Sequence, residues 1–290
     1  MDYYNIWYDI FEYLEFKNRL SLVVSSSIFR NNLIITHIID HRSPKFYSRI
    51  RQWIIEEDLF KNLRAFTVNG RIDDIFSLKH LKKLVFYNEN SLSEDSICHL
   101  DLDFLAIPSN KKIRDVSFLR NLKKLLAPSC TKLDQSGISN LDLIELDIDE
   151  CKKINNVSFM RNLKKLSITG SCGVDQAGIQ GLDLIELYAN YNIKITNVSF
   201  MKNLQILEAS GTCGIGQDGI KNLNLIKLNA QNNRKIIDVS FMTNLKRLDA
   251  MNSSGISQNG IQGLKLLELY KYGNSKITDE SYIKNIDQIK

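Results

Sequence analysis

The feature that most constrains this chain is a segment that recurs with a fixed period of 41 residues. VSFLRNLKKL begins at residue 116, close copies begin at residues 157, 198 and 239, and a weaker copy begins at residue 75. A Gly-Ile pair beginning at residues 137, 178, 219 and 260 keeps the same period. Such a period indicates a solenoid, in which each unit packs only against its neighbours.

Each unit divides into two similar halves, each with a leucine pattern close to LxxLx(L/I/A). The copies begin at Leu63, Leu81, Leu102, Leu122, Leu143, Leu163, Leu184, Leu204, Leu225, Leu245 and Leu266. From Leu81 onward the steps alternate between 21 and 20 residues. Eight residues after the first leucine, most copies carry a side chain that can hydrogen-bond to a turning backbone, namely Asn110, Cys130, Cys151, Ser171, Asn192, Thr212, Asn233, Ser253 and Asn274.

This pattern resembles the leucine-rich-repeat family, whose signature is LxxLxLxxN/C with one strand per repeat. The resemblance runs from about residue 59 to residue 290 and covers eleven copies of the pattern. It implies an α/β fold, a right-handed solenoid with a parallel β-sheet on its concave face. Repeats of 20 and 21 residues leave little room for full helices, so we expect short, tight helical turns on the convex side. Their expected starting residues are Asp134, Gln135, Asp175, Gln176, Gln217 and Gln258.

Alternation along each strand predicts which residues enter the core, because successive side chains of a strand face opposite ways. The residues three and five positions after the first leucine are expected to point inward, and those two, four and six positions after it are expected to point outward. On the return segment of each unit, a column of phenylalanines is expected to fill the interior: Phe118, Phe159, Phe200 and Phe241.

The outward residues predict a binding surface. At the second position, opposite charges repeatedly fall on neighbouring strands, which favours a column that stabilises the sheet. The fourth and sixth positions instead combine carboxylates with tyrosines, which favours contact with a basic protein or peptide. The candidate target-binding residues are Asp147, Asp149, Tyr188, Glu208, Asp249, Tyr270 and Tyr272.

Residues 4–33 lie outside the repeat register, and their apolar residues have helical spacing. They resemble an F-box, the helical module that holds the Skp-type adaptor of cullin-RING ubiquitin ligases; the matching residues are Ile10, Phe11, Tyr13, Leu14, Leu20, Leu22, Val24, Ser25 and Phe29. The sequence departs from the family at Ile6-Trp7, where the family has Leu-Pro. The resemblance implies an adaptor contact through Ile6, Trp7, Ile10, Phe11, Leu14, Leu20 and Leu22.

The expected organisation is therefore an F-box-like helical module over residues 1–33, a joining helix or linker over 34–58 and the solenoid over 59–290. It predicts a substrate-recruiting subunit of a ubiquitin ligase, which binds a Skp-type adaptor through its N-terminus and a basic protein target through its concave face. The alternative is a leucine-rich-repeat binding scaffold with no ubiquitin role, in which the N-terminal helices only cap the solenoid.

Residue clusters for catalysis, cofactors or metals are not evident. His37 and His41 could share a helix face, but no further ligand completes a metal site. The glycine-rich stretches from residues 170 and 211 lack the Lys-Ser/Thr ending of a phosphate-binding loop, and we interpret them as turns. With four histidines and no nucleophile-base set, we expect a protein that is not an enzyme and that binds neither a metal nor a cofactor.

Composition indicates the compartment. An odd set of five cysteines without a CxxC arrangement indicates reduced thiols and a cytoplasmic or nuclear protein. The N-terminus lacks the basic and apolar stretches of a secretory signal, and the apolar runs fall short of the ~18 residues that span a bilayer. A net charge of +5 spread over a long surface does not favour nucleic acid. We therefore expect neither membrane nor nucleic-acid contact.

Overall fold

The computed structural model describes residues 37–39, 65–68, 78–87 and 92–279, which form a solenoid around one 12-stranded parallel sheet. The strands follow one another in sequence order, so each coil adds the next strand. They are β1 (His37–Ile39), β2 (Ala65–Val68), β3 (Lys83–Phe86), β4 (Phe104–Ala106), β5 (Lys124–Leu126), β6 (Glu145–Asp147), β7 (Lys165–Ser167), β8 (Glu186–Tyr188), β9 (Ile206–Glu208), β10 (Lys227–Asn229), β11 (Arg247–Asp249) and β12 (Glu268–Tyr270).

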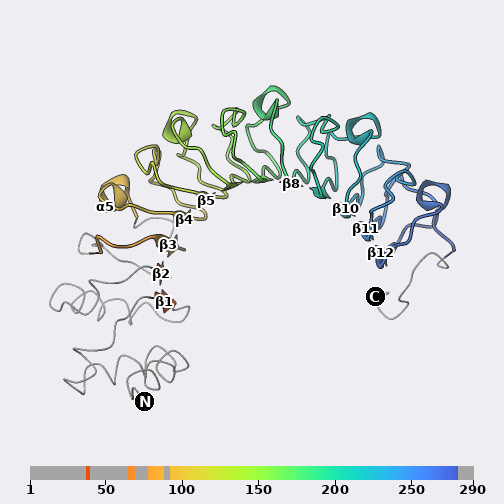
Figure 1. Cartoon of the computed structure of the whole chain (residues 1–290), viewed down its shortest axis with the longest axis horizontal. Coiled ribbons are helices and arrows are strands. Elements are labelled where there is room, and N and C mark those ends of the chain that lie inside the picture. Colours follow the sequence, from red (N-terminus) through yellow and green to blue (C-terminus); the bar gives the residue numbers. More distant parts are fainter. Residues whose placement is uncertain (1–36, 40–64, 69–77, 88–91, 280–290) are drawn as a thin grey trace, which may run out of the picture.

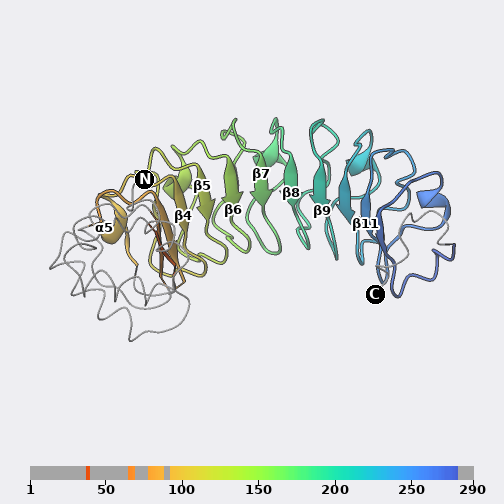
Figure 2. The same cartoon turned by 60° about the horizontal axis from the view of Figure 1, so that its bottom comes forward.

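The coils stack into an arc whose inner side is the sheet, as Figure 1 shows. Turned forward, the strands stand side by side along the whole arc (Figure 2). Within the described residues, the outer side carries one short α-helix, α5 (Glu94–Ile97), and four 3-10 helices: η2 (Ser136–Ile138), η3 (Ala177–Ile179), η4 (Asp218–Ile220) and η5 (Asn259–Ile261). The predicted parallel sheet on the concave face and the tight convex turns are thus confirmed.

The core is one continuous column of apolar side chains inside the coils. In the coil that begins at Leu143, the inward positions of the strand are Leu146 and Ile148, and all three side chains are buried. Each such side chain contributes roughly 1.5–3 kcal/mol through burial. Because the same positions recur in every coil, the repeated leucines specify both the strand and its inner face.

The phenylalanine column was predicted wrongly. Phe159 is 36% exposed and Phe241 is 40% exposed, while Phe118 and Phe200 are partly buried against the core. The residue after each phenylalanine occupies the interior instead, and these residues are Leu119, Met160, Met201 and Met242. In the VSFM segment the valine and the fourth residue point inward, which turns the ring between them toward the surface.

A ladder of buried polar side chains ties several coils to the coil before them. Nδ2 of Asn233 donates to the carbonyl oxygens of Ala209 at 2.7 Å and Ile215 at 3.0 Å, while its Oδ1 accepts the N–H of Lys235. The thiol of Cys130 donates to the carbonyl oxygen of Ile107 at 3.0 Å. These contacts satisfy backbone groups that the turn leaves without strand partners.

The ladder differs from the prediction in three coils. Ser171, Thr212 and Ser253 are exposed, and the next residue in each coil is buried, namely Cys172, Cys213 and Ser254. These coils carry their extra residue in the turn after the strand. That insertion moves the buried position from eight to nine residues after the first leucine.

The convex turns are joined by glutamine side chains rather than capped by them. Oε1 of Gln176 accepts the N–H groups of Thr196 and Asn197, and its Nε2 donates to the carbonyl oxygen of Asn197 at 2.8 Å. The predicted role in starting the turn belongs to the aspartates, since Oδ1 of Asp175 accepts the N–H of Gly178 at 3.0 Å. The glutamines therefore link successive coils as a strand pairing would.

The sheet begins earlier than the repeat pattern suggests. β1 pairs in parallel with β2, with His37 opposite Ala65. The joining helix or linker predicted over residues 34–58 therefore contains a strand rather than a helix at His37–Ile39, and His41 lies outside the described residues. The remaining residues of that segment, and the F-box-like module over 1–33, lie outside the described residues.

Candidate functional site

The concave face carries the predicted column of alternating charges. Strand pairing aligns Lys124, Glu145, Lys165 and Glu186 on β5 to β8, which confirms the register. Nζ of Lys165 lies 3.2 Å from Oε1 of Glu145 and 3.6 Å from Oε2 of Glu186, and Lys124 pairs with Glu145 at 3.0 Å. Although burial opposes it, hydrogen bonds from both lysines hold the pKa of Glu145 below its usual value. This stretch is internally neutralised.

The alternation breaks at β9, where Ile206 takes the place of a charged residue. Lys227 on β10 then lies between Ile206 and Arg247 in this column. It reaches diagonally to Glu208 instead, with Nζ 2.7 Å from Oε1. Arg247 pairs with Glu268 on its other side at 2.8 Å. The single apolar residue Ile206 thus changes which charged side chains pair with one another on β9 to β12.

Glu208, one of the candidate target-binding residues, has a carboxylate that is already paired. Its side chain accepts Lys227 on one oxygen and Nδ2 of Asn229 on the other at 2.7 Å, and the residue is only 8% exposed. A paired and buried carboxylate of this kind supports neighbouring side chains more readily than it binds a ligand.

Asp147 and Asp149 lie together at the end of β6. Oδ1 of Asp149 accepts the hydroxyl of Ser167 and the N–H of Thr169, both at 2.6 Å. Among the described residues, Asp147 accepts a hydrogen bond only from the N–H of Asp149, at 3.1 Å. Burial raises the pKa of Asp147 to about 6, and the carboxylates of Asp149 and Glu145 add to that rise. Asp147 is therefore the less satisfied member of the pair.

The three predicted tyrosines have different surroundings. The hydroxyls of Tyr188 and Tyr270 donate to Glu186 at 2.9 Å and to Glu268 at 3.0 Å, so the column of charges fixes both rings. Lys165 lies over the Tyr188 ring, with Nζ 5.5 Å from its centroid. Tyr272 is 79% exposed. The structure thus offers two fixed aromatic walls and one exposed ring.

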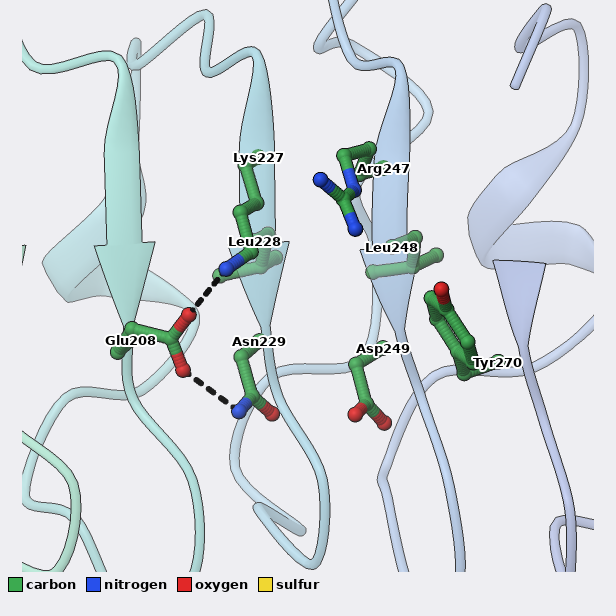
Figure 3. Close-up of a pocket in the computed structure, with 8 residues that line it drawn as sticks. All are labelled: Glu208, Lys227, Leu228, Asn229, Arg247, Leu248, Asp249 and Tyr270. Carbon is green, nitrogen blue, oxygen red and sulfur yellow. Dashed lines mark hydrogen bonds and ion pairs between the residues drawn. The ribbon is translucent and has the colours of Figure 1, made fainter. Parts of the chain in front are cut away.

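A hollow of about 150 Å³ lies between β9 and β12 (Figure 3). Figure 3 shows Lys227 and Asn229 turned toward Glu208, while the carboxylate of Asp249 stands apart from that contact. Burial raises the pKa of Asp249, and nearby Glu208 reinforces the rise. The lining residues are Glu208, Lys227, Leu228, Asn229, Arg247, Leu248, Asp249 and Tyr270.

The hollow brings three predicted residues together and adds residues that the sequence did not single out. Glu208, Asp249 and Tyr270 all line it, whereas Asp147, Asp149 and Tyr188 lie on earlier strands. Lys227 and Arg247 were expected only to stabilise the sheet. The signal for the hollow is the apolar Ile206 within the charged column, because it leaves Lys227 without a partner in that column.

The described part of the chain holds no group of three or more His, Cys, Asp or Glu side chains that could bind a metal ion, and none of its helices is long and apolar enough to cross a membrane. Burial raises the pKa of the Cys130 and Cys151 thiols to about 12 and that of Cys172 to about 11. Such thiols stay protonated and do not act as nucleophiles. The adaptor-binding candidates, Ile6 to Leu22, lie outside the described residues.

Comparison with known proteins shows the fold. No family model and no curated protein matches the sequence. Among solved structures, the yeast complex of Rad7 and Elc1 matches with a TM-score of 0.53 and 16% identity, covering 99% of this chain and 90% of that chain. The functional domain of InlJ from Listeria monocytogenes, which includes a cysteine ladder, matches with a TM-score of 0.46 and 19% identity, covering 73% of this chain and 54% of that chain. The parallel solenoid and the match to the Rad7 and Elc1 complex agree with the fold that the leucine-rich-repeat pattern predicts.

Proposed function

We propose that this chain is a non-catalytic substrate receptor of a cullin-RING ubiquitin ligase, which binds a basic segment of its target on the concave face. The observation that carries the binding role is the state of Asp147 and Asp249. Both are half-buried carboxylates on the open face of the sheet, and each accepts one backbone hydrogen bond. Burial without compensating partners is unfavourable, and a cationic partner relieves it.

Fixed aromatic side chains support the same role. Glu186 and Glu268 hold the side chains of Tyr188 and Tyr270 by hydrogen bonds. Because both rings are already fixed, they lose little conformational entropy when a partner packs against them. Tyrosine is enriched among the residues that dominate binding energy at protein interfaces. Tyr188 and Tyr270 belong to β8 and β12, two strands of the sheet that forms the inner side of the arc in Figure 1.

The ligase role rests on the F-box-like pattern of residues 4–33 placed before the repeats. A chain of similar fold, Rad7, forms a complex with a second protein, Elc1. That complex supports the idea that a solenoid of this kind assembles with a partner subunit. The identity of the adaptor for this chain, a Skp-type protein, follows from the sequence resemblance alone.

The test is a co-purification experiment on three proteins: the full chain, the variant Phe11→Ala and a chain that lacks residues 1–33. The deletion stops there because β1 begins at His37 and belongs to the sheet. With a purified Skp-type adaptor, the full chain should form a stable complex and both variants should lose it. The target protein should still bind to all three chains.

The alternative is a binding scaffold with no ubiquitin role. It is favoured by the position of β1, because the residues before it in the sequence adjoin the first strand of the sheet, where a solenoid needs a cap. Under this alternative, Phe11→Ala lowers the melting temperature and the adaptor binds none of the three chains. That pair of results would overturn the ligase proposal and leave the concave-face proposal standing.

A further inference from the structure

We propose that the hollow between β9 and β12 receives a single cationic side chain, an arginine or a lysine, of the bound protein. Asp249 is its counter-ion and the Tyr270 ring forms one wall. This inference rests on the proposed binding role of the concave face. It identifies the hollow as the position at which that face is most selective for the bound protein.

Asp249 has the hydrogen-bonding capacity for such a ligand. Its Oδ1 accepts the N–H of Met251 at 3.1 Å. The strand neighbours that could donate to it, Asn229 and Tyr270, lie opposite it in the register but donate to Glu208 and Glu268 instead. Within the described residues, no donor reaches the second carboxylate oxygen of Asp249, which therefore remains open to a cation.

The charges around the hollow favour a cation over an anion. Lys227 is paired with Glu208 at 2.7 Å and Arg247 with Glu268 at 2.8 Å. Each cation is thus matched by one carboxylate, and the charge of Asp249 is left over. Because the site is partly shielded from water, this uncompensated charge acts more strongly than an exposed one.

Size and shape limit the ligand to one side chain. A volume of about 150 Å³ is well below the roughly 300 Å³ at which pockets for drug-sized molecules begin. The hollow is open on the concave side, so a side chain can enter from a partner that lies along the arc. The Tyr270 ring is held by its hydroxyl bond and offers a face to a guanidinium or ammonium group.

The direct test is a titration followed by NMR of the full chain with N-acetyl-arginine amide. The neutral analogue N-acetyl-citrulline amide has the same shape without the charge, and N-acetyl-lysine amide compares the two cations. We expect shifts in the backbone signals of Asn229, Asp249 and Tyr270 with the two cationic compounds and none with citrulline. Equal shifts with citrulline, or none with either cation, would overturn the inference.

Three variants identify the counter-ion. Asp249→Asn keeps the shape and should weaken binding of the arginine compound by about tenfold to a hundredfold, as expected for a lost charge-assisted hydrogen bond. Arg247→Gln removes a repelling cation and should strengthen binding. Asp218→Asn, which removes the same charge from an exposed residue of η4 on the convex side, is the control and should leave binding unchanged.

An anion site predicts the opposite signs. If N-acetyl-glutamate amide binds here and Arg247→Gln abolishes that binding, the hollow is a site for a carboxylate and the inference is wrong. The proposed function fails separately. A target protein that loses affinity with Asp147→Lys but keeps it with Asp249→Asn would retain the concave-face role while refuting the assignment of this hollow.

Discussion

A Cβ atom on Gly178 would lie 2.1 Å from the carbonyl oxygen of Asn155 in the preceding coil. The same approach recurs at Gly137, one repeat before, and at Gly219 and Gly260, one and two repeats after, with distances of 2.0 to 2.2 Å. The carbonyl oxygen of Gly178 also accepts the N–H of Val157 at 2.9 Å. Glycine at this position lets the convex turns of successive coils touch.

Gly178→Ala should therefore destabilise the solenoid by about 3 kcal/mol, because backbone on both sides must shift to admit the methyl group. Chemical denaturation measures the change. The control is Gly216→Ala, where the nearest atom to the new Cβ is a side-chain carbon of Lys235 at 3.1 Å. Equal losses for both variants would show that the close approach is unimportant.

The asparagine ladder predicts a difference between two polar positions of the turn. Asn233→Ala removes two bonds to buried carbonyl oxygens and one from a backbone N–H, and should cost about 3 kcal/mol. Ser253→Ala, at the corresponding sequence position of the next coil, is exposed and should cost less than about 0.5 kcal/mol. Thermal melting of both variants checks the displaced register. Similar losses would contradict it.

The burial pattern of the return segment predicts that Met160 contributes more to the stability of the fold than the neighbouring Phe159. Met160 is fully buried, and Met160→Ala should cost about 2–5 kcal/mol through lost burial and a cavity. Phe159 is 36% exposed, so Phe159→Ala should cost only about 1 kcal/mol. Urea denaturation of the two single variants provides the comparison. A larger loss for Phe159→Ala would contradict the placement of the ring at the surface.

The raised pKa of Asp147 predicts that the stability of the folded chain depends on pH. Its pKa is raised to about 6, above the unfolded value of about 3.9, so the folded chain binds the proton more tightly than the unfolded chain. Stability should fall as pH rises from about 4 to about 6 and then level off, because burial, reinforced by the charges of Asp149 and Glu145 and opposed by that of Lys165, sets the raised pKa.

Asp147→Asn removes that titration. The variant should be more stable than the wild type at neutral pH by roughly 1–2 kcal/mol, and the two proteins should converge near pH ~4. Denaturation curves across this range measure both effects. A constant difference between the proteins at every pH would show that Asp147 does not carry the raised pKa.

The repeat period, the strand register and the inner face of the sheet followed from the sequence because each is repeated many times. Lys124, Glu145 and Lys165 align as their spacing predicts, since one strand per repeat leaves a single register. The convex side was less predictable. Phe159 and Met160 are both apolar, and alternation does not apply to a segment without strand geometry, so the pattern alone could not decide which of them points inward.

The candidate surface followed only in part. The places of Asp249 and Tyr270 in the repeat pattern correctly predicted that both residues face the concave side. The repeat pattern could not predict that Lys227 neutralises Glu208, because the pair joins the second position of one repeat to the fourth position of its neighbour. The hollow depends on such side-chain directions, which a repeat pattern does not specify. The segment before β1 has no repeats to support it, and its F-box-like function rests on resemblance.

The concave-face claim is tested most directly by reversing its two least satisfied carboxylates in the double variant Asp147→Lys, Asp249→Lys. The probe is a fluorescein-labelled peptide of alternating arginine and glycine, followed by anisotropy at about 0.05 M and about 0.5 M salt. The control, Asp95→Lys with Asp218→Lys, makes the same charge change at exposed residues on α5 and η4 of the convex side.

We predict that the wild type and the control bind the peptide with affinities that fall as salt rises, and that the double variant loses at least about tenfold at low salt. Equal affinity and equal salt dependence for all three proteins would contradict the account, because the peptide would then bind away from the concave face.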